Sequence, residues 1–333
     1  MRSLLFLVLA AAAVSAADTA QLHIFEMAKP GEVSEVAKIP ALAAAAYGRP
    51  HMTAPPIPVF RLSDVAFLGA ARKEKLDVYF PFGAARTDRP AVVFIHGGGF
   101  TAGDKAEYRS ASVSADLCRA GYVVVSCNYV LGSKSAPGVW PQNIADCRQA
   151  IRWLRMHAKE LGVNPEKIAV AGGSAGGYLA LMVGLSDDKT GPGGEAGAQV
   201  SAKVSGVIDM YGVVDFSKHG AGDIPGVPAA DQRNYLPVTQ CDANDPAVLI
   251  LHGTADTTVD IAQSTEMAKA LRTAKTSYEY VMVDGAPHTF DLHPRGKGWK
   301  RTGQVAGAEV VSQSAQPDLT EVVLAFLART IGK

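Results

Sequence analysis

Short apolar runs alternate along the chain with longer segments in which apolar residues recur at helical spacing. Residues 91–95 and 122–126 are continuous apolar runs, which are typical of strands buried on both faces of a sheet. Residues 75–80 instead alternate between polar and apolar side chains, as a half-buried strand does. Similar runs predict further strands at residues 168–170, 204–209, 247–251 and 278–283.

Helical patterns fall between these strands. The clearest covers residues 141–161, with Pro141 at its start and Gly162 just past its end, the usual residues at these two positions. Asp260 is placed to cap a second helix, and Asp318 with Glu321 resembles a capping box for a third. Strands that alternate with helices predict a single α/β domain, with a mostly parallel sheet covered by helices on both faces.

The first 16 residues have the pattern of a secretory signal peptide. Arg2 precedes an unbroken apolar run over residues 4–13, and small residues follow as far as Ala16. The run is too short to cross a bilayer, which takes about 20 residues. We therefore expect cleavage near Ala16, a secreted or periplasmic protein, and no membrane span after cleavage. Residues 17–58 then form an N-terminal arm, ahead of a domain over residues 59–333.

Charge and cysteine content narrow the possible partners and cofactors. The 333 residues include 32 basic and 32 acidic side chains with no long basic run, so a nucleic-acid partner held by bulk charge is excluded. No clustered His and Cys set is present, and we expect no metal. Export would permit disulfides, and two alternatives stay open, disulfides or buried thiols. The four cysteines are Cys118, Cys127, Cys147 and Cys241.

The segment Gly172–Gly177 follows a predicted strand and precedes a predicted helix. It contains G-x-S-x-G, in which the serine occupies a sharp strand-to-helix turn and its hydroxyl is held clear of the sheet. The residues two before and two after this serine approach each other closely, so glycine is required at both positions. The motif predicts Ser174 as a nucleophile.

A second glycine-rich segment, His96-Gly-Gly-Gly-Phe100, follows the strand at residues 91–95. Glycines at this point allow backbone N–H groups to face a carbonyl oxygen of a substrate. We therefore predict an oxyanion hole formed by the N–H groups of Gly97, Gly98 and Ala175. His96 lies at the end of the strand and is predicted to be structural.

A serine nucleophile needs a base and a carboxylate that orients the base. Asp256 and His288 lie in loops after successive predicted strands, at the same end of the sheet as Ser174, in the order Ser, Asp, His. We predict Asp256 as the orienting carboxylate and His288 as the base. The rival positions are Asp260, Asp284 and His293, and His252 is predicted to be structural.

These segments, in the order HGGGF, GGSAGG, HGTADTTV and GAPHTF, resemble the serine esterases of the α/β-hydrolase superfamily with the HGGG lipase/esterase motif. Residues 128–129, 141–161 and 164–165 are similar to secreted bacterial feruloyl and acetyl-xylan esterases. The resemblance implies an α/β-hydrolase fold with the eight-stranded type of sheet, and a reaction that needs no cofactor. Phe100 departs from the Trp often found there, and Asp260 from a Pro.

By this resemblance, the chain is a secreted serine carboxylic-ester hydrolase that acts on acetyl or feruloyl esters of carbohydrates. A general short-chain carboxylesterase or lipase is the alternative, and a serine peptidase or a non-catalytic binding member fits less well. Residues 212–241 would form a short lid-like insertion, and either this segment or the arm could cover the site. The sequence does not decide the oligomeric state. Five aromatic residues are expected to bind substrate: Phe100, Tyr129, Trp140, Tyr178 and Tyr211.

Overall fold

A computed structural model describes residues 24–26, 59–81, 86–133, 139–195, 197–217, 223–224 and 226–333. The predicted signal peptide, the cleavage position near Ala16 and nearly all of the predicted arm lie outside these residues, as do residues 218–222 and 225 of the predicted insertion. Within the described ranges, no helix is both long enough and apolar enough to cross a membrane.

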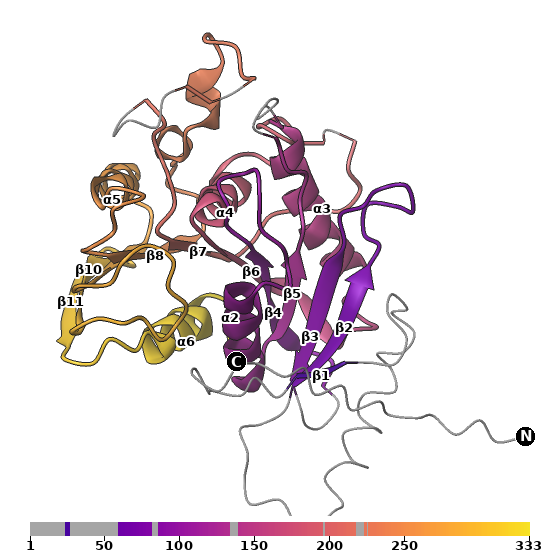
Figure 1. Cartoon of the computed structure of the whole chain (residues 1–333), viewed down its shortest axis with the longest axis horizontal. Helices are drawn as coiled ribbons and strands as arrows, with labels where there is room; N and C mark the ends of the chain where they lie inside the picture. Colours follow the sequence, from indigo (N-terminus) through magenta and orange to yellow (C-terminus); the bar gives the residue numbers. More distant parts are fainter. Residues whose placement is uncertain are drawn as a thin grey trace, which may run out of the picture.

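One twisted sheet runs through the molecule, with strand order β1-β2-β3-β5-β4-β6-β7-β8-β9-β10-β11 (Figure 1). Strands β5, β4, β6, β7, β8 and β9 are parallel to their neighbours in that order, and antiparallel strands lie on both sides of them. The strands are β1 Ile24–Glu26, β2 Val59–Val65, β3 Leu76–Pro81, β4 Arg89–Ile95, β5 Val123–Cys127, β6 Val163–Gly173, β7 Gly206–Met210, β8 Ala247–Gly253, β9 Tyr278–Val283, β10 Trp299–Val305 and β11 Ala308–Ser314.

Helices cover both faces of the sheet, as the sequence pattern predicted. Side chains of α3, α4 and α5 pack into the apolar core on one face, and those of α2 and α6 pack into the core on the other. Alternate residues of β4 divide between the two cores, because successive side chains of a strand point to opposite faces. The helices are α2 Tyr108–Arg119, α3 Gln142–Met156, α4 Ala175–Leu185, α5 Ala262–Ala274 and α6 Thr320–Thr330.

The structure corrects several details of the sequence prediction. The described sheet has eleven strands rather than eight. Strands β1, β2, β10 and β11 extend it beyond the strands that the apolar pattern predicted. Helix α2 has a serine-rich buried face and was not predicted. Helix α3 ends at Met156 rather than at residue 161, and the chain continues through turns to Gly162. All four cysteines are free thiols.

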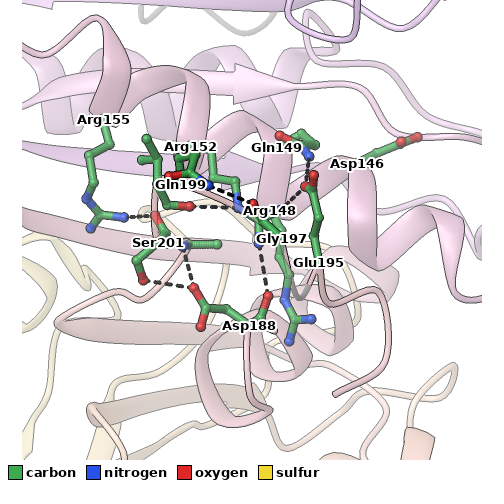
Figure 2. Close-up of polar contacts among 12 residues, drawn as sticks. Asp146, Arg148, Gln149, Arg152, Arg155, Asp188, Glu195, Gly197, Gln199 and Ser201 are labelled. Atoms are coloured by element: carbon green, nitrogen blue, oxygen red, sulfur yellow. Dashed lines mark hydrogen bonds and ion pairs between the residues drawn. The ribbon is translucent and has the colours of Figure 1, made fainter. Parts of the chain in front are cut away.

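Three arginines on α3 hold the loop that follows α4 (Figure 2). Arg148 is fully buried and donates to the carbonyl oxygens of Pro192 and Ser186 and to the hydroxyl of Ser186, at 2.8, 2.9 and 2.8 Å. Burial lowers the pKa of Arg148 to about 10. Arg152 donates to the backbone carbonyl oxygens of residues 188 and 200. Arg155 donates to those of residues 165, 201 and 203. Because Ser186 caps the end of α4, this loop and α4 are fastened to α3 together.

Replacing Arg148 with Met should destabilise the fold, because the carbonyl of Ser186 would stay buried without this donor and the partly buried carbonyl of Pro192 would lose its donor. We expect the free energy of unfolding to fall by about 2–3 kcal/mol, measured by urea denaturation. Gln149→Ala is the matched control on the same helix, since its hydrogen bond to Glu195 is exposed and should contribute less than about 0.5 kcal/mol. Equal urea midpoints for the two variants would contradict this account.

Candidate active site

Ser174 lies at the turn where β6 ends and α4 begins. Its backbone has φ of 57° and ψ of −121°, a left-handed conformation that is strained for any residue with a side chain. A Cβ atom on Gly172 would lie 2.2 Å from the carbonyl oxygen of Gly176, and one on Gly176 would lie 2.1 Å from that of Ile95. Glycine is therefore the residue that lets this turn close.

His288 and Asp256 form a hydrogen-bonded chain with Ser174. Nε2 of His288 lies 3.0 Å from Oγ of Ser174, and Nδ1 lies 2.6 Å from Oδ2 of Asp256. Asp256 follows β8 and His288 follows β9, so both loops are at the carboxyl ends of neighbouring parallel strands. The Asp256 side chain is fully buried, whereas that of His288 is 11% exposed, so the imidazole is the part of the pair that solvent can reach.

Hydrogen bonds keep the Asp256 carboxyl ionised in spite of its burial. Burial alone would raise its pKa. Hydrogen bonds to the ionised form have the opposite effect and lower the pKa well below its usual range. These bonds come from the rings of His252 and His288 and from the backbone N–H groups of residues 259 and 258. The two backbone N–H groups lie 2.9 and 2.8 Å from Oδ1. The carboxylate is thus fixed in place and available as an acceptor for His288.

The structure places the rival residues elsewhere. Asp260 accepts the N–H of Ala262, the first residue of α5, at 2.9 Å, but it lies one position before the N-cap residue, which is Ile261 and not Asp260 as the sequence predicted. Asp284 accepts from the hydroxyl of Thr254 at 3.3 Å. His293 is half exposed and lies between Asp116 and Asp318, at 3.0 and 2.6 Å, on the side of the molecule formed by α2 and α6.

The loop after β4 packs directly against the Ser174 turn. A Cβ atom on Gly97 would lie 2.8 Å from the carbonyl oxygen of Gly173 and 3.3 Å from the Cβ atom of Ser174. Gly98 has φ of 113°, which turns the backbone at this point, and Ala175 is the first residue of α4. The three residues predicted to form an oxyanion hole therefore adjoin Ser174, and Ala175 is at the helix end that favours negative charge.

Behind this loop, His96 is fully buried and stacks on Tyr129, with ring centroids 4.5 Å apart. The hydroxyl of Tyr129 donates to the carbonyl oxygen of His96 at 3.2 Å, and burial lowers the pKa of His96. Both side chains support the glycine-rich loop from inside the core. Tyr129, which the sequence suggested as a substrate-binding residue, is buried there and is not available to a substrate.

Three of the predicted aromatic residues, Phe100, Trp140 and Tyr178, pack together with Phe216. The ring centroid of Phe100 lies 4.8 Å from that of Trp140 and 6.0 Å from that of Phe216. The backbone N–H of Tyr178 bonds to the carbonyl oxygen of Ser174, so this aromatic cluster lies beside the turn. Phe216 was missed because it lies in a segment without regular periodicity. The ring centroid of Tyr211, the fifth residue, lies 4.9 Å from that of His288. Tyr178 and Tyr211 are fully buried, as Tyr129 is, and Trp140 is the cluster member with a partly exposed side chain.

A second buried carboxyl group, Asp209, lies at the end of β7 under the first turn of α4. Its Oδ1 accepts the N–H of Gly212 at 2.9 Å, and its Oδ2 has no partner among the described residues. Burial raises the pKa of Asp209 to about 7, because one hydrogen bond does not replace the lost hydration of the ionised form. Asp209 was not predicted as a functional or titrating group, because it occurs at the end of a predicted apolar strand.

The described residues contain no group of three or more His, Cys, Asp or Glu side chains placed to hold a metal ion. Asp187 accepts the backbone N–H groups of residues 189 and 190, and Asp188 accepts that of Ala202. These two acidic residues therefore serve the loop that the α3 arginines hold.

Comparison with known proteins places this chain among esterases. The family model described as BD-FAE matches residues 76–271, a range that includes Ser174 and Asp256. The probable carboxylic ester hydrolase LipM of Mycobacterium tuberculosis is 29% identical over 248 residues, which are 69% of this chain and 56% of LipM. Esterase LipQ of the same organism is 30% identical over 282 residues, 79% of this chain and 64% of LipQ. The chain thus spans less than two thirds of either relative.

Solved structures show the same fold. A truncated carbohydrate esterase from gut microbiota has a TM-score of 0.59 and 25% identity, covering 68% of this chain and 88% of that one. Thermogutta terrifontis esterase 2, phosphorylated by paraoxon, has a TM-score of 0.61 and 27% identity, covering 84% and 95%. Two further structures of that organism's esterase have propionate or butyrate bound, and both have a TM-score of 0.58 and cover 73% of this chain. The propionate-bound structure is 28% identical and is itself covered to 88%, and the butyrate-bound structure is 29% identical and covered to 87%. The predicted α/β-hydrolase fold is confirmed.

The raised pKa of Asp209 gives the stability a specific pH dependence. Between about pH 4 and about pH 7 the unfolded chain releases the proton of Asp209 while the folded chain keeps it, so this group makes the fold less stable as pH rises. Asparagine does not ionise, so Asp209→Asn removes this pH-dependent contribution to stability. The stability of the variant relative to wild type should therefore increase over that range and level off above it.

Urea denaturation of both proteins at several pH values measures the difference. Glu160→Gln, at an exposed carboxylate, is the control and should show no such trend. A constant difference between Asp209→Asn and wild type across the range would contradict the assignment.

Proposed function

The chain belongs to the BD-FAE family, and we propose that it is a serine carboxylic-ester hydrolase that works through an acyl-enzyme intermediate. The observation that carries the proposal is the hydrogen-bonded chain from Ser174 through His288 to Asp256, which adjoins the glycine-rich loop after β4. The relatives named as esterases and the solved esterase structures support the same reaction class.

In the acylation step, His288 accepts the proton of the Ser174 hydroxyl through Nε2 while Oγ attacks the ester carbonyl carbon. His288 then gives this proton to the leaving alkoxide, and the acyl group remains on Ser174. Water then attacks the acyl carbon while His288 accepts its proton, and His288 returns this proton to Oγ of Ser174 as the bond to the acyl carbon breaks and the acid leaves. Asp256 holds Nδ1–H, so that Nε2 is the nitrogen free to accept.

The tetrahedral intermediate carries a negative oxygen, which the backbone N–H groups of Gly97, Gly98 and Ala175 would stabilise. These groups are fixed because the loop after β4 and the start of α4 are in close contact, so they need not reorganise during the reaction. Removal of one such donor costs about 10²- to 10³-fold in kcat in comparable enzymes. The N-terminus of α4 adds a favourable electrostatic contribution.

For the substrate, we favour acetyl or feruloyl esters of carbohydrates, with a secreted or periplasmic enzyme as the first 16 residues suggest. The family and the structural similarity to a carbohydrate esterase support this choice. A general short-chain carboxylesterase is supported equally by the similarity to an esterase with bound propionate and butyrate. Trp140, the partly exposed member of the aromatic cluster, would line the acyl or sugar pocket. The buried rings of Phe100, Tyr178 and Phe216 would support it from behind, and the buried ring of Tyr211 packs beside His288.

Ser174→Ala should abolish both hydrolysis of p-nitrophenyl acetate and covalent labelling by a fluorophosphonate probe, because the attacking oxygen is lost. We expect kcat to fall by roughly 10⁵-fold or more. Ser205→Ala changes an exposed serine and should keep wild-type rates and labelling. Labelling of Ser174→Ala at the wild-type level would show that the nucleophile lies elsewhere.

The two substrate classes are separated by measuring acetate and ferulate release from xylan beside the hydrolysis of simple aryl esters. Release from xylan is the expected result, and turnover of the aryl esters alone would favour the general carboxylesterase.

The aromatic cluster can be tested in the same assays. Trp140→Ala should change the ratio of kcat/KM for butyrate and acetate esters by about threefold or more, because a partly buried ring is removed from the pocket wall. Trp140→Phe keeps a ring and serves as the control, with a smaller change expected. An unchanged ratio in Trp140→Ala would remove this residue from the pocket.

A further inference from the structure

The carboxylate of Asp256 contacts a second imidazole, that of His252 at the end of β8. Nε2 of His252 lies 3.1 Å from Oδ2 of Asp256, the same oxygen that Nδ1 of His288 contacts at 2.6 Å. Nε2 of His252 also lies 3.0 Å from the carbonyl oxygen of Val259, and its Nδ1 lies 2.6 Å from Oγ of Ser264 on α5. The side chains of His252 and Asp256 are both fully buried.

The chemistry of these contacts fixes the tautomer of His252. The Val259 carbonyl oxygen and the ionised Asp256 carboxylate can only accept hydrogen bonds, so Nε2 of His252 must carry a hydrogen, and this one hydrogen is shared between the two acceptors. In the neutral ring, Nδ1 is then an acceptor, and the hydroxyl of Ser264 must donate to it. The donors therefore point in one direction, from Ser264 to His252 and from His252 to Asp256.

With His252 included, four donors hold the Asp256 carboxylate. Oδ2 accepts from His252 and His288, and Oδ1 accepts from the N–H groups of Thr258 and Val259. Of these donors, only His288 reaches Ser174, and the other three stay fixed during the reaction. A carboxylate that accepts hydrogen bonds at both oxygens cannot rotate away from His288 without leaving buried donors unpaired. Unpaired buried donors raise the free energy of the folded state, so the carboxylate keeps its orientation.

Other ionisable groups face this assembly. Asp209 on β7 interacts electrostatically with His252, and burial together with the nearby Asp209 carboxyl raises the pKa of Tyr280 on β9. Tyr211, which follows β7, contacts the ring of His288 and interacts with Asp256. The pKa of Asp209 is about 7, so its ionisation falls in the pH range of an esterase assay and has to be separated from that of His288.

We propose that His252 is a positioning residue of the esterase site: its Nε2–H orients the Asp256 carboxylate and draws electron density from it, so that His288 is held correctly but can still release its proton. The inference rests on the proposed function. Without this donor, Asp256 would be a stronger acceptor, and the protonated form of His288 would persist to higher pH. A residue that merely filled space at this position would have no such effect on the pH profile.

His252→Phe keeps a ring but loses both nitrogens, whereas His252→Gln can present an amide N–H near the position of Nε2. For His252→Phe we expect kcat/KM for p-nitrophenyl acetate to fall about tenfold, with KM little changed. The pH below which kcat/KM declines should rise by about half a unit or more. His252→Gln should restore most of the rate and return the profile toward that of wild type.

Two further comparisons keep the test valid if His252→Phe does not fold. Ser264→Ala removes the donor to Nδ1 and should shift the profile in the same direction by a smaller amount. Ser114→Ala, at a buried serine of α2, is its matched control and should leave the profile unchanged. All profiles are repeated in the Asp209→Asn background, where the shifts should persist.

A folded His252→Phe variant with the wild-type pH profile would overturn the inference. It would also be overturned if His252→Gln had no higher kcat/KM than His252→Phe, or if the shift in the pH profile were absent in the Asp209→Asn background. If His252→Phe does not fold, a wild-type profile for Ser264→Ala overturns it. In each of these cases wild type would still hydrolyse esters and be labelled by the fluorophosphonate probe. Absence of both activities in wild type would instead refute the proposed function itself.

Discussion

Three backbone segments meet at the Ser174 turn so closely that there is no room for a side chain at Gly172 or Gly176. The turn itself has a left-handed backbone, Gly176 is packed against the carbonyl oxygen of Ile95, and the N–H of Ser174 bonds to the carbonyl oxygen of Met210 at 2.8 Å. These contacts join the ends of β6, β4 and β7, which are adjacent in the sheet. The position of the serine therefore depends on the register of three central strands, and the hydrophobic packing of the sheet pays for the strain of the turn.

Two buried aspartates near this turn show how hydrogen bonding decides the charge of a carboxyl group. Burial disfavours the ionised form of both Asp256 and Asp209. Asp256 has four donors and a pKa far below its usual range, whereas Asp209 has one donor within the described structure and a pKa of about 7. The fold thus keeps one carboxylate charged beside His288, and at acidic pH holds the other uncharged beneath the helix that begins at Ala175.

Long-range contacts also support the surroundings of the site. The aromatic cluster unites four segments of the chain, represented by Phe100, Trp140, Tyr178 and Phe216, on one side of the turn. At the far end of α4, Arg148 binds the cap residue Ser186 and so fixes the helix to α3. Helix α4 is held at both ends by contacts from other elements, which keeps its N-terminus still against the loop after β4.

Local sequence was sufficient for much of the architecture. Apolar runs located the central strands, and the glycine spacing around residue 174 predicted a sharp strand-to-helix turn, because burial and backbone conformation are encoded by neighbouring residues. The same patterns did not predict α2, whose buried face contains serines, or the hairpin of β10 and edge strand β11, in which polar residues interrupt any apolar run.

The sequence by itself determined which segments end at the same edge of the sheet, and thus that Ser174, Asp256 and His288 are neighbours. Only the tertiary structure decided that His252 shares an oxygen of Asp256 with His288, that Tyr129 is buried behind the glycine-rich loop, and that Phe216 completes the aromatic cluster. These contacts join residues from different segments, and their distances depend on strand register and helix packing, which no local pattern specifies.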